Sequence, residues 1–251
     1  MRCEDNPQVR PSATESMGYY QHFERLSHWW LRETKALAVE ILHRSISPGG
    51  NVLDAGCGPG ELMKLLVNQY RTIGIDVSDR AVTFARCGGL VFVVRGDLEH
   101  LPFAQECFDA VVSLDVLYHA DIRDDRRALR EIRRVLRPGG WLILNLPAYE
   151  WMRSAHDDFI QTARRYTARR VRHLLEEASL SIERVTYHNT LLFPLAVVQR
   201  RVLRMKNADS IRMPLWLDRM LGATLAIERY WLRWTSLPFG LSVLAVGRKP
   251  S

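Results

Sequence analysis

The stretch Val52-Leu53-Asp54-Ala55-Gly56-Cys57-Gly58-Pro59-Gly60-Glu61 decides the fold. It predicts a short apolar strand that runs into a glycine-rich turn, and the turn opens a helix. Glycines in such a turn let the backbone adopt positive φ and approach a ligand with no Cβ in the way. A dinucleotide-binding GxGxxG would need a glycine at position 61, where Glu61 stands. The acid Asp54 before the turn suits a cationic or amine-bearing ligand better than a pyrophosphate.

Strands and helices alternate around this turn. Alternation at this pitch implies βαβ units and a doubly wound, mostly parallel sheet, so the sequence predicts a Rossmann-like α/β fold with seven strands. The expected strands are 51–54, 72–76, 90–94, 108–114, 141–146, 181–187 and 241–247. The expected helices are 19–45, 61–70, 79–87, 124–136 and 167–178, with two more in a helical insertion before the last strand, split near 207–214.

Two further acids follow the next two strands. Asp76 ends the second strand, and a carboxylate there can accept both hydroxyls of a ribose. Asp97 follows the third strand, where it can meet an adenine amino group. Alone, each acid could cap a helix or form a turn. Because three acids follow three successive strands beside GxGxG, the sequence favours a ligand crevice at the carboxyl ends of the strands.

Five segments in register together resemble the class I S-adenosylmethionine-dependent methyltransferases. The resemblance is closest to the type 11 branch, which includes the ubiquinone and menaquinone biosynthesis enzymes. The five segments run from residue 52 to residue 147, so the resemblance covers about 100 residues. The segments are VLDAGCGPG at 52–60, GIDVS at 74–78, GDLEHLPF at 96–103, FDAVVSLDVLYH at 108–119 and LRPGGWLILNLP at 136–147.

The resemblance implies the cofactor S-adenosyl-L-methionine, with S-adenosyl-L-homocysteine as product. Gly56, Gly58 and the backbone around Cys57 would cradle its methionine part, with Asp54 near the ammonium. The ribose would lie on Asp76. By the same resemblance, Val77 and Leu98 would sandwich the adenine, Asp97 would meet its amino group, and Leu114 would lie near the sulfonium.

A second resemblance lies upstream, in His28-Trp29-Trp30-Leu31-Arg32. It looks like the HWWxxR stretch of some bacterial members, in which this helix lids the cofactor. It implies that Trp29 or Trp30 closes over the sulfonium and that Arg32 meets the methionine carboxylate. Adjacent residues point about 100° apart on a helix, so at most one tryptophan is expected to face the cofactor. An ordinary amphipathic helix is the alternative.

Candidate groups for the acceptor follow the fourth and fifth strands. His119 can act as a general base or can fix a turn. His156 stands beside two acids and can be a general base oriented by a carboxylate, or half of a metal site. Because adjacent residues rarely converge on one metal, no metal site is expected. Tyr166 and its neighbouring arginines are the remaining catalytic and acceptor-binding candidates. Relatives that read HD…GHxRRYT carry His where Thr162 stands here, so their base is absent or replaced.

The insertion 190–235 holds eight basic and three acidic residues. A helix there carries an apolar stripe of Trp216, Met220, Ala223, Ile227, Trp231 and Trp234. Such a helix can cap an acceptor pocket, lie on a membrane surface, form a dimer seam or simply pack on the sheet. The chain is therefore divided into an N-terminal helical lid at 1–46, a cofactor-binding domain at 47–189 and 236–251, and this insertion.

Composition narrows the function. The chain has 251 residues, 47% hydrophobic and 25% charged, and a net charge of +7, which excludes disordered and fibrous classes. Four scattered cysteines and a polar N-terminus predict a cytoplasmic protein, with peripheral membrane contact left open. The expected activity is methyl transfer to a small or lipid-like biosynthetic acceptor, at oxygen, carbon or nitrogen. A nucleic-acid methyltransferase and a non-catalytic cofactor-binding scaffold are the alternatives, and a monomer or homodimer is expected.

Overall fold

The computed structural model describes residues 29–198 and 215–251, without the side chains of 155, 156, 215 and 216. The predicted helix segment 19–28 and the predicted helix break near 207–214 lie outside these residues. Within the described part of the chain, no helix is long and apolar enough to cross a membrane.

In residues 29–198 and 215–251, seven strands form one sheet in the order β3-β2-β1-β4-β5-β7-β6. β7 runs antiparallel to both of its neighbours, and the other neighbouring pairs are parallel. The prediction of a seven-stranded, mostly parallel sheet is confirmed. The strands are β1 (Asn51–Ala55), β2 (Arg71–Asp76), β3 (Val93–Arg95), β4 (Phe108–Leu114), β5 (Leu136–Pro147), β6 (Ser181–His188) and β7 (Ser242–Arg248).

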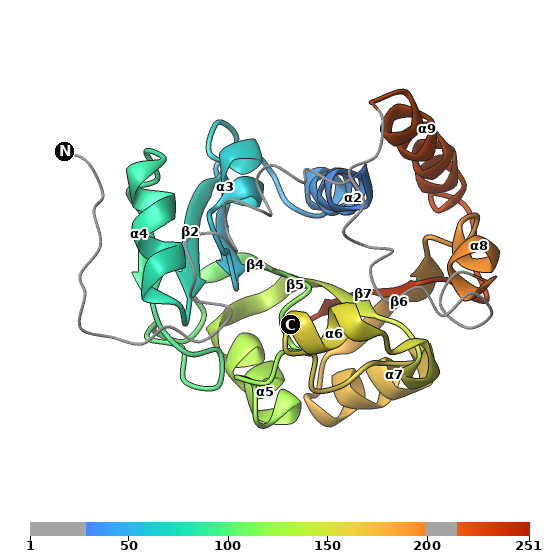
Figure 1. The fold of residues 1–251 in the computed structure, drawn as a ribbon. Coiled ribbons are helices and arrows are strands. Elements are labelled where there is room, and N and C mark those ends of the chain that lie inside the picture. The colour runs from blue at the N-terminus through green and yellow to red at the C-terminus, as the bar shows by residue number, and fades with distance from the viewer. Residues whose placement is uncertain (1–28, 199–214) are drawn as a thin grey trace.

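Helices cover both faces of the sheet (Figure 1). One apolar cluster joins α2 and α3 to the sheet, and another lies under α5 and α7. The alternation of side chains across each strand explains this, since Val112 of β4 belongs to the first cluster and its neighbour Val111 to the second. The helices are α2 (Trp29–Ser45), α3 (Glu61–Leu66), α4 (Asp79–Cys87), α5 (Asp125–Val135), η2 (Glu150–Met152), α6 (Ala155–Phe159), α7 (Ala168–Glu177), α8 (Phe193–Val197) and α9 (Leu215–Trp231).

Capping side chains set the helix starts that position the loops of the crevice. Asp124 accepts hydrogen bonds from the backbone N–H groups of Arg126 and Arg127 at the start of α5. Thr167 caps α7, as the sequence predicts, and Ser78 caps α4. The sequence misplaces some ends: α3 ends at Leu66, short of the expected residue 70, and β5 starts at Leu136, ahead of the expected residue 141.

Candidate functional site

The glycine turn between β1 and α3 is tightly packed at Gly56 and open at Gly58. Gly56 has φ of +87°, and a Cβ there would lie 2.3 Å from Val116 Cγ2. Gly58 has φ of +52°, and a Cβ there would meet no atom within 4 Å. The N–H groups of Gly56 and Cys57 both donate to the Ile75 carbonyl, at 2.8 and 2.9 Å. The turn therefore leaves open space for a ligand at Gly58, whereas the N–H groups of Gly56 and Cys57 are already hydrogen-bonded.

Asp54 lies buried on β1, directly before this turn. Its Oδ2 has no hydrogen-bond partner, although a buried carboxylate oxygen normally has one. Burial raises the pKa of Asp54 to about 7, with a further rise from Asp76 and an opposing effect of Lys35. Asp54 does not cap α3, because Gly60 holds that position and no side chain caps the helix. An ammonium group placed at Oδ2 would satisfy and ionise this carboxylate.

Asp76 at the end of β2 points into the same turn. Its Oδ2 accepts the Gly58 N–H at 2.8 Å and its Oδ1 accepts the Ser78 N–H at 2.9 Å. Burial raises the pKa of Asp76, and these two backbone N–H groups and the nearby His119 oppose the rise. Each oxygen keeps a further lone pair, so a pair of ribose hydroxyls can still bind. Val77, the next residue, exposes its side chain to solvent, as a side chain that packs on a ligand ring requires.

The loop after β3 fits the prediction less well. Asp97 is half exposed, and its oxygens receive the Glu99 N–H at 2.9 Å and approach His100 Nδ1 at 3.2 Å. It forms a turn and still has capacity for an amino group. Leu98 is buried in the apolar cluster under α5, which leaves almost none of its side chain for a ligand. A sandwich of adenine by the Leu98 side chain is therefore not supported in this arrangement.

A buried hydrogen-bonded chain lies at the carboxyl ends of β4, β5 and β6. His188 Nε2 donates to Asn145 Oδ1 at 2.5 Å, and Asn145 Nδ2 donates to Asp115 Oδ1 at 2.9 Å. Asp115 follows Leu114, which packs against the α2 cluster, and has φ of +58°, an uncommon conformation that is often held at functional sites. Burial raises the pKa of Asp115 to about 7, with Asn145 and Lys35 opposing, and lowers the pKa of His188 to about 4.

Lys35 of α2 lies over these acids. It forms an ion pair with Glu61. Burial lowers the pKa of Lys35, and the charges of Asp54 and Asp115 oppose this. The helix that precedes the sheet therefore brings a cation to the crevice through Lys35. The sequence analysis did not single out Lys35, Asp115, Asn145 or His188. Only the position of Asp115 directly after a strand, which it shares with Asp97, could have drawn attention to it.

His119 lies at the edge of the crevice. Its Nδ1 accepts the Asp121 N–H at 3.3 Å and lies 3.2 Å from an Asp121 carboxylate oxygen. Its backbone forms a bridge with Thr162, whose Oγ1 is buried without a hydrogen-bond partner. His119 therefore fixes a turn at the edge of the crevice, near Asp76.

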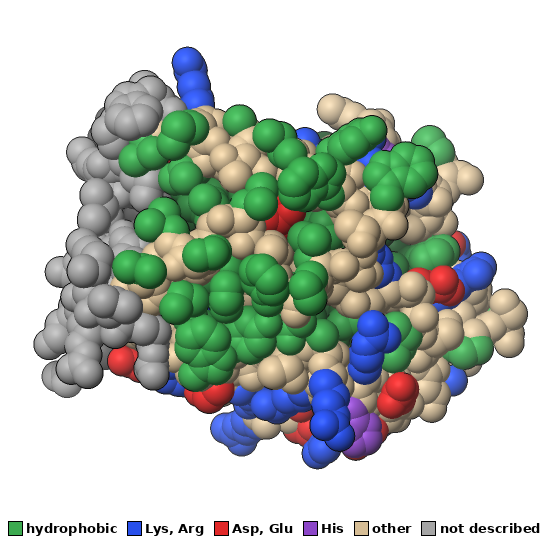
Figure 2. All heavy atoms as spheres, turned by 90° about the vertical axis from the view of Figure 1, so that its right-hand side faces the viewer, with side chains coloured by type: hydrophobic (Ala, Val, Ile, Leu, Met, Phe, Trp, Pro, Cys, Tyr) green, Lys and Arg blue, Asp and Glu red, His purple; other side chains and the backbone are tan. Residues whose placement is uncertain are grey.

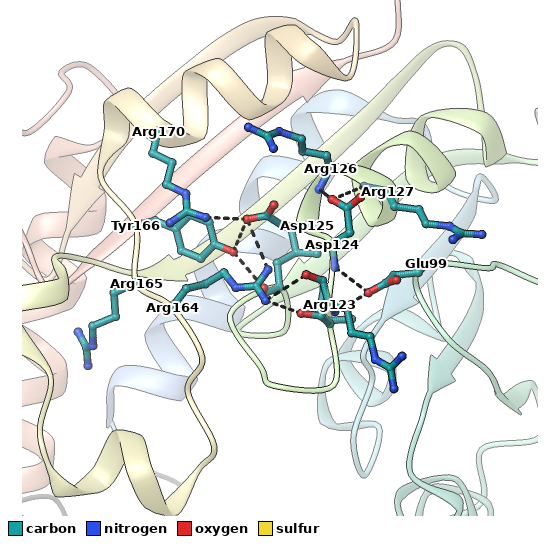
Figure 3. Close-up of polar contacts among 12 residues, drawn as sticks. Glu99, Arg123, Asp124, Asp125, Arg126, Arg127, Arg164, Arg165, Tyr166 and Arg170 are labelled. Atoms are coloured by element: carbon teal, nitrogen blue, oxygen red, sulfur yellow. Dashed lines mark hydrogen bonds and ion pairs between the residues drawn. The ribbon is translucent and has the colours of Figure 1, made fainter.

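Tyr166 is fully buried, and Figure 3 shows its hydroxyl beside Asp125. Its hydroxyl lies 3.0 Å from the Leu117 carbonyl and 3.1 Å from Asp125 Oδ2, which also receives Arg170. Burial is the main cause that raises the pKa of this hydroxyl. A hydroxyl held this way joins the loop before α7 to the start of α5, and its full burial gives it no access to an acceptor. The proposed catalytic role of Tyr166 is therefore dropped in favour of a structural one.

The remaining acceptor candidates are occupied or not described. Arg165 is buried in a bidentate ion pair with Asp157, at 2.8 and 3.0 Å, and Arg164 donates to the Ile122 carbonyl at 2.6 Å. These arginines brace loops and leave no group for a substrate phosphate. The side chain of His156, on α6, lies outside the described residues. Among the described residues, no group of three or more His, Cys, Asp or Glu side chains could hold a metal.

The tryptophan pair at the start of α2 faces the insertion. Trp29 is buried against Leu221 and Leu225 of α9, and its ring meets that of Trp30 edge to face at 5.5 Å. Arg32 donates to Asp218 of α9 at 2.8 Å. These contacts fasten α9 onto α2. The contacts of Trp29 support the alternative that this helix packs in the ordinary way. The expected contacts of Trp29 and Arg32 with a cofactor stay predictions.

The strand order and the acid-lined glycine turn agree with the arrangement of a class I S-adenosylmethionine-dependent methyltransferase domain of the type 11 kind. Residues 53–144 match the family model Methyltransf_11, described as a methyltransferase domain. The chain is 39% identical over 104 residues to the "Probable tRNA methyltransferase 9B" of Mus musculus, a match that covers 41% of this chain and only 23% of that protein.

Two solved structures share the fold. One is a chain of the complex between the Haloferax volcanii Trm112 methyltransferase activator and a methyltransferase, with a TM-score of 0.64, 23% identity and coverage of 97% and 100%. The other is the Haemonchus contortus phosphoethanolamine N-methyltransferase 2 with S-adenosyl-L-methionine, with a TM-score of 0.62, 16% identity and coverage of 98% and 62%. The cofactor of this family is S-adenosyl-L-methionine.

Proposed function

We propose that this chain moves a methyl group from S-adenosyl-L-methionine to a small or lipid-like biosynthetic acceptor. The observation that carries the proposal is the unpartnered Oδ2 of Asp54, buried beside the open face of Gly58. A buried carboxylate oxygen without a partner is costly unless a ligand cation completes it. The ammonium of the methionine part provides that cation, and Asp76 lies next to it for the ribose.

The chain's own groups bind and orient the donor, which when bound supplies a sulfonium methyl as the electrophile. Asp54 holds the ammonium, Asp76 the ribose hydroxyls, and Asp97 the adenine amino group. Val77 packs on the adenine, and Leu114 lies on the sulfonium side at the end of β4. Because the donor carries the reactive group, the protein has mainly to align the acceptor and, where needed, to remove a proton.

Asp115 is the group proposed to take that proton. It lies at the carboxyl end of β4, its Oδ1 is fixed by Asn145, and its pKa of about 7 suits a base at neutral pH. Asn145 and His188 act as positioning residues. His119 stays a second candidate, with a turn-fixing contact that Asp115 lacks.

Asp115→Asn is expected to lower kcat at least about tenfold, about 1.4 kcal/mol of barrier, because an amide cannot accept the acceptor's proton. The change keeps the shape of the side chain and its bond to Asn145. The measurement is release of S-adenosyl-L-homocysteine with acceptor drawn from cell extract. His119→Ala and His156→Ala serve as comparisons. If Asp115→Asn turns over at the wild-type rate, Asp115 is not the base.

The chemistry of the acceptor is inferred from an aromatic group that follows β5. The Tyr149 ring stacks between Trp151 and Tyr187, with centroids 5.6 and 5.1 Å apart. Phe193 meets the edge of Tyr149 at 5.7 Å and approaches Phe239 at 5.5 Å. Flat apolar faces of this kind favour an acceptor with an apolar or ring-shaped body.

The proposal is tested by calorimetry and turnover together. Purified protein is expected to bind S-adenosyl-L-homocysteine and to methylate a component of a small-molecule or lipid extract. Binding without product from any extract would favour a cofactor-binding scaffold. Absence of binding would remove the proposal.

A nucleic-acid acceptor is the second candidate, and a basic face favours it. Residues 123–137, which include α5, hold seven arginines and three carboxylates. α7 packs beside α5 and adds the exposed Arg169 and Arg172. A hollow of about 430 Å³ on this face is lined in part by Arg127 and Arg130. Clustered arginines on one face are the electrostatic footprint of a polyanion partner, and the relative from Mus musculus is named as a tRNA methyltransferase.

If this candidate is correct, Arg130→Glu combined with Arg169→Glu is expected to weaken binding of bulk tRNA at least about tenfold at low salt, because two phosphate contacts become repulsive. Filter binding measures the effect. Arg219→Glu, on the exposed surface of α9, is the matched control and should bind as the wild type does. Equal loss in both variants, or methylated product that survives nuclease, contradicts a nucleic-acid acceptor.

A further inference from the structure

α9 has two apolar faces, and within the described part of the chain only one of them packs on the protein. Leu221, Leu225 and Leu232 are buried on the inner side. Glu228 is buried there too, and its Oε2 accepts the N–H groups of Thr190 and Leu191 at 2.8 and 3.0 Å. The inner face therefore packs its apolar side chains on the protein, and the buried carboxylate of Glu228 is hydrogen-bonded.

The outer face of α9 is apolar and open to solvent. Its side chains are between 48% and 80% exposed, with Trp234, just past the helix end, the most exposed. A helix on a soluble protein normally turns charged residues outward, so this arrangement is inverted. The members are Met220, Ile227, Tyr230, Trp231 and Trp234.

The open apolar surface extends to α8, which lies beside α9 at the same end of the molecule (Figure 1). Leu191, Leu195 and Val198 are between 40% and 61% exposed. Figure 2 shows hydrophobic side chains gathered over this side. We call these three residues, the four of α9 and Trp234 the outer patch. Contiguous exposed apolar surface of this kind marks an interaction site.

In the sequence, residues 190–235, which include α8 and α9, hold eight basic and three acidic residues. Both acids of α9 are engaged, Asp218 by Arg32 and Glu228 by the backbone. Arg229 and Arg233 are anchored to Glu33 and Glu40 of α2, at 3.4 and 2.6 Å, and stay partly exposed. Arg219 is exposed on the same helix.

We infer that the outer patch docks on a membrane surface that carries anionic lipids. Tryptophan and tyrosine beside aliphatic side chains suit the boundary between headgroups and acyl chains. The exposed Arg219 and the excess of basic residues in 190–235 suit anionic headgroups. The convex side of one helix inserts shallowly and does not span the bilayer. This inference is independent of the methyl acceptor.

The test is co-sedimentation of the full chain with phosphatidylcholine vesicles that contain about one third phosphatidylglycerol. The wild type is expected to bind, with a blue shift of tryptophan emission, and to bind pure phosphatidylcholine less well. Ile227→Lys combined with Trp231→Lys should weaken binding at least about tenfold. Phe92→Lys is the matched control, because Phe92 is 67% exposed but lies just before β3, and it should bind as the wild type does.

Trp234→Ser provides a second variant that does not touch the inner face of α9, and it should also weaken binding. Melting temperature confirms that each variant is folded. The inference is overturned if the wild type stays in the supernatant, or if Phe92→Lys loses binding as much as the patch variants do. It is also overturned if light scattering shows a dimer that the patch variants dissociate while vesicle binding is unchanged, since the patch then belongs to a second copy of the chain.

Discussion

Asp76→Ala is expected to weaken binding of S-adenosyl-L-homocysteine at least about 100-fold. Two ribose hydroxyls lose a charged acceptor, and hydrogen bonds to charged groups each contribute about 1.5–3 kcal/mol. The Gly58 N–H also loses its acceptor, so the glycine turn is held less firmly. Both losses act on donor binding, and isothermal calorimetry measures their sum.

The control for this variant is Asp79→Ala. Asp79 is an exposed acid at the start of α4, three residues after Asp76. Its substitution removes the same charge without affecting the glycine turn. The dissociation constant of Asp79→Ala for S-adenosyl-L-homocysteine should match that of the wild type. An unchanged constant for Asp76→Ala, in protein whose melting temperature shows it to be folded, removes the ribose assignment.

Donor binding is expected to tighten as pH rises from about 6 to about 8. Burial raises the pKa of Asp54 from 3.8 to about 7, so the ligand-free protein holds a proton there at pH 6 and releases it near neutrality. The ammonium of the ligand pairs with the ionised form, so affinity rises up to about tenfold per pH unit below the pKa and then levels off. Asp54→Asn should weaken binding at pH 8 and flatten this dependence.

The same raised pKa has a consequence for stability. Above the unfolded value and below about 7, the folded protein binds a proton at Asp54 that the unfolded chain has released. The unfolding free energy of the ligand-free protein therefore falls as pH rises from about 4 to about 7, and Asp54→Asn removes this contribution.

Asp115→Asn separates the two acids. Asp115 has a similar pKa of about 7 but is bonded to Asn145, so that variant should keep the pH dependence of donor binding. A flat profile in the wild type, or an Asp54→Asn profile that follows the wild type, contradicts the pairing of Asp54 with the ammonium.

Local pattern was sufficient to predict the sheet and to predict that the glycine turn, Asp54 and Asp76 lie close together. The hydrogen bonds that join the glycine turn to the end of β2 link residues at most 19 positions apart, and Thr167 caps α7 through a residue three positions away. Spacing constrains geometry over such distances. That is why GxGxG with Asp54 and Asp76 could be interpreted from the sequence.

Residues whose partners are distant in sequence could not be interpreted this way. The Tyr166 hydroxyl meets Leu117 and Asp125, 49 and 41 positions away, and no local pattern reveals that burial. The Asp115–Asn145–His188 chain likewise spans three strands. Arginines that looked available for a phosphate are held by carbonyls and carboxylates of other loops.

The stripe on α9 shows a different limit. Helical spacing correctly predicts that Met220, Ile227 and Trp231 share one side of the helix. It does not predict which side faces the protein, because the leucines at 221, 225 and 232 form an equally regular stripe. The leucine stripe faces inward because Leu221 and Leu225 pack against Trp29 and because Glu228 on that side accepts the Thr190 N–H.

The pairing of β6 with β7 has a consequence for how such a chain can vary. His188 lies opposite Ser242 in an antiparallel ladder, a geometry that a two-residue reverse turn can close. The chain instead travels through residues 189–241 between those two positions. That excursion can therefore lengthen, shrink or be exchanged for another without altering the order of the strands, and the half of the sheet around β1 and β2 keeps its glycine turn and acids throughout.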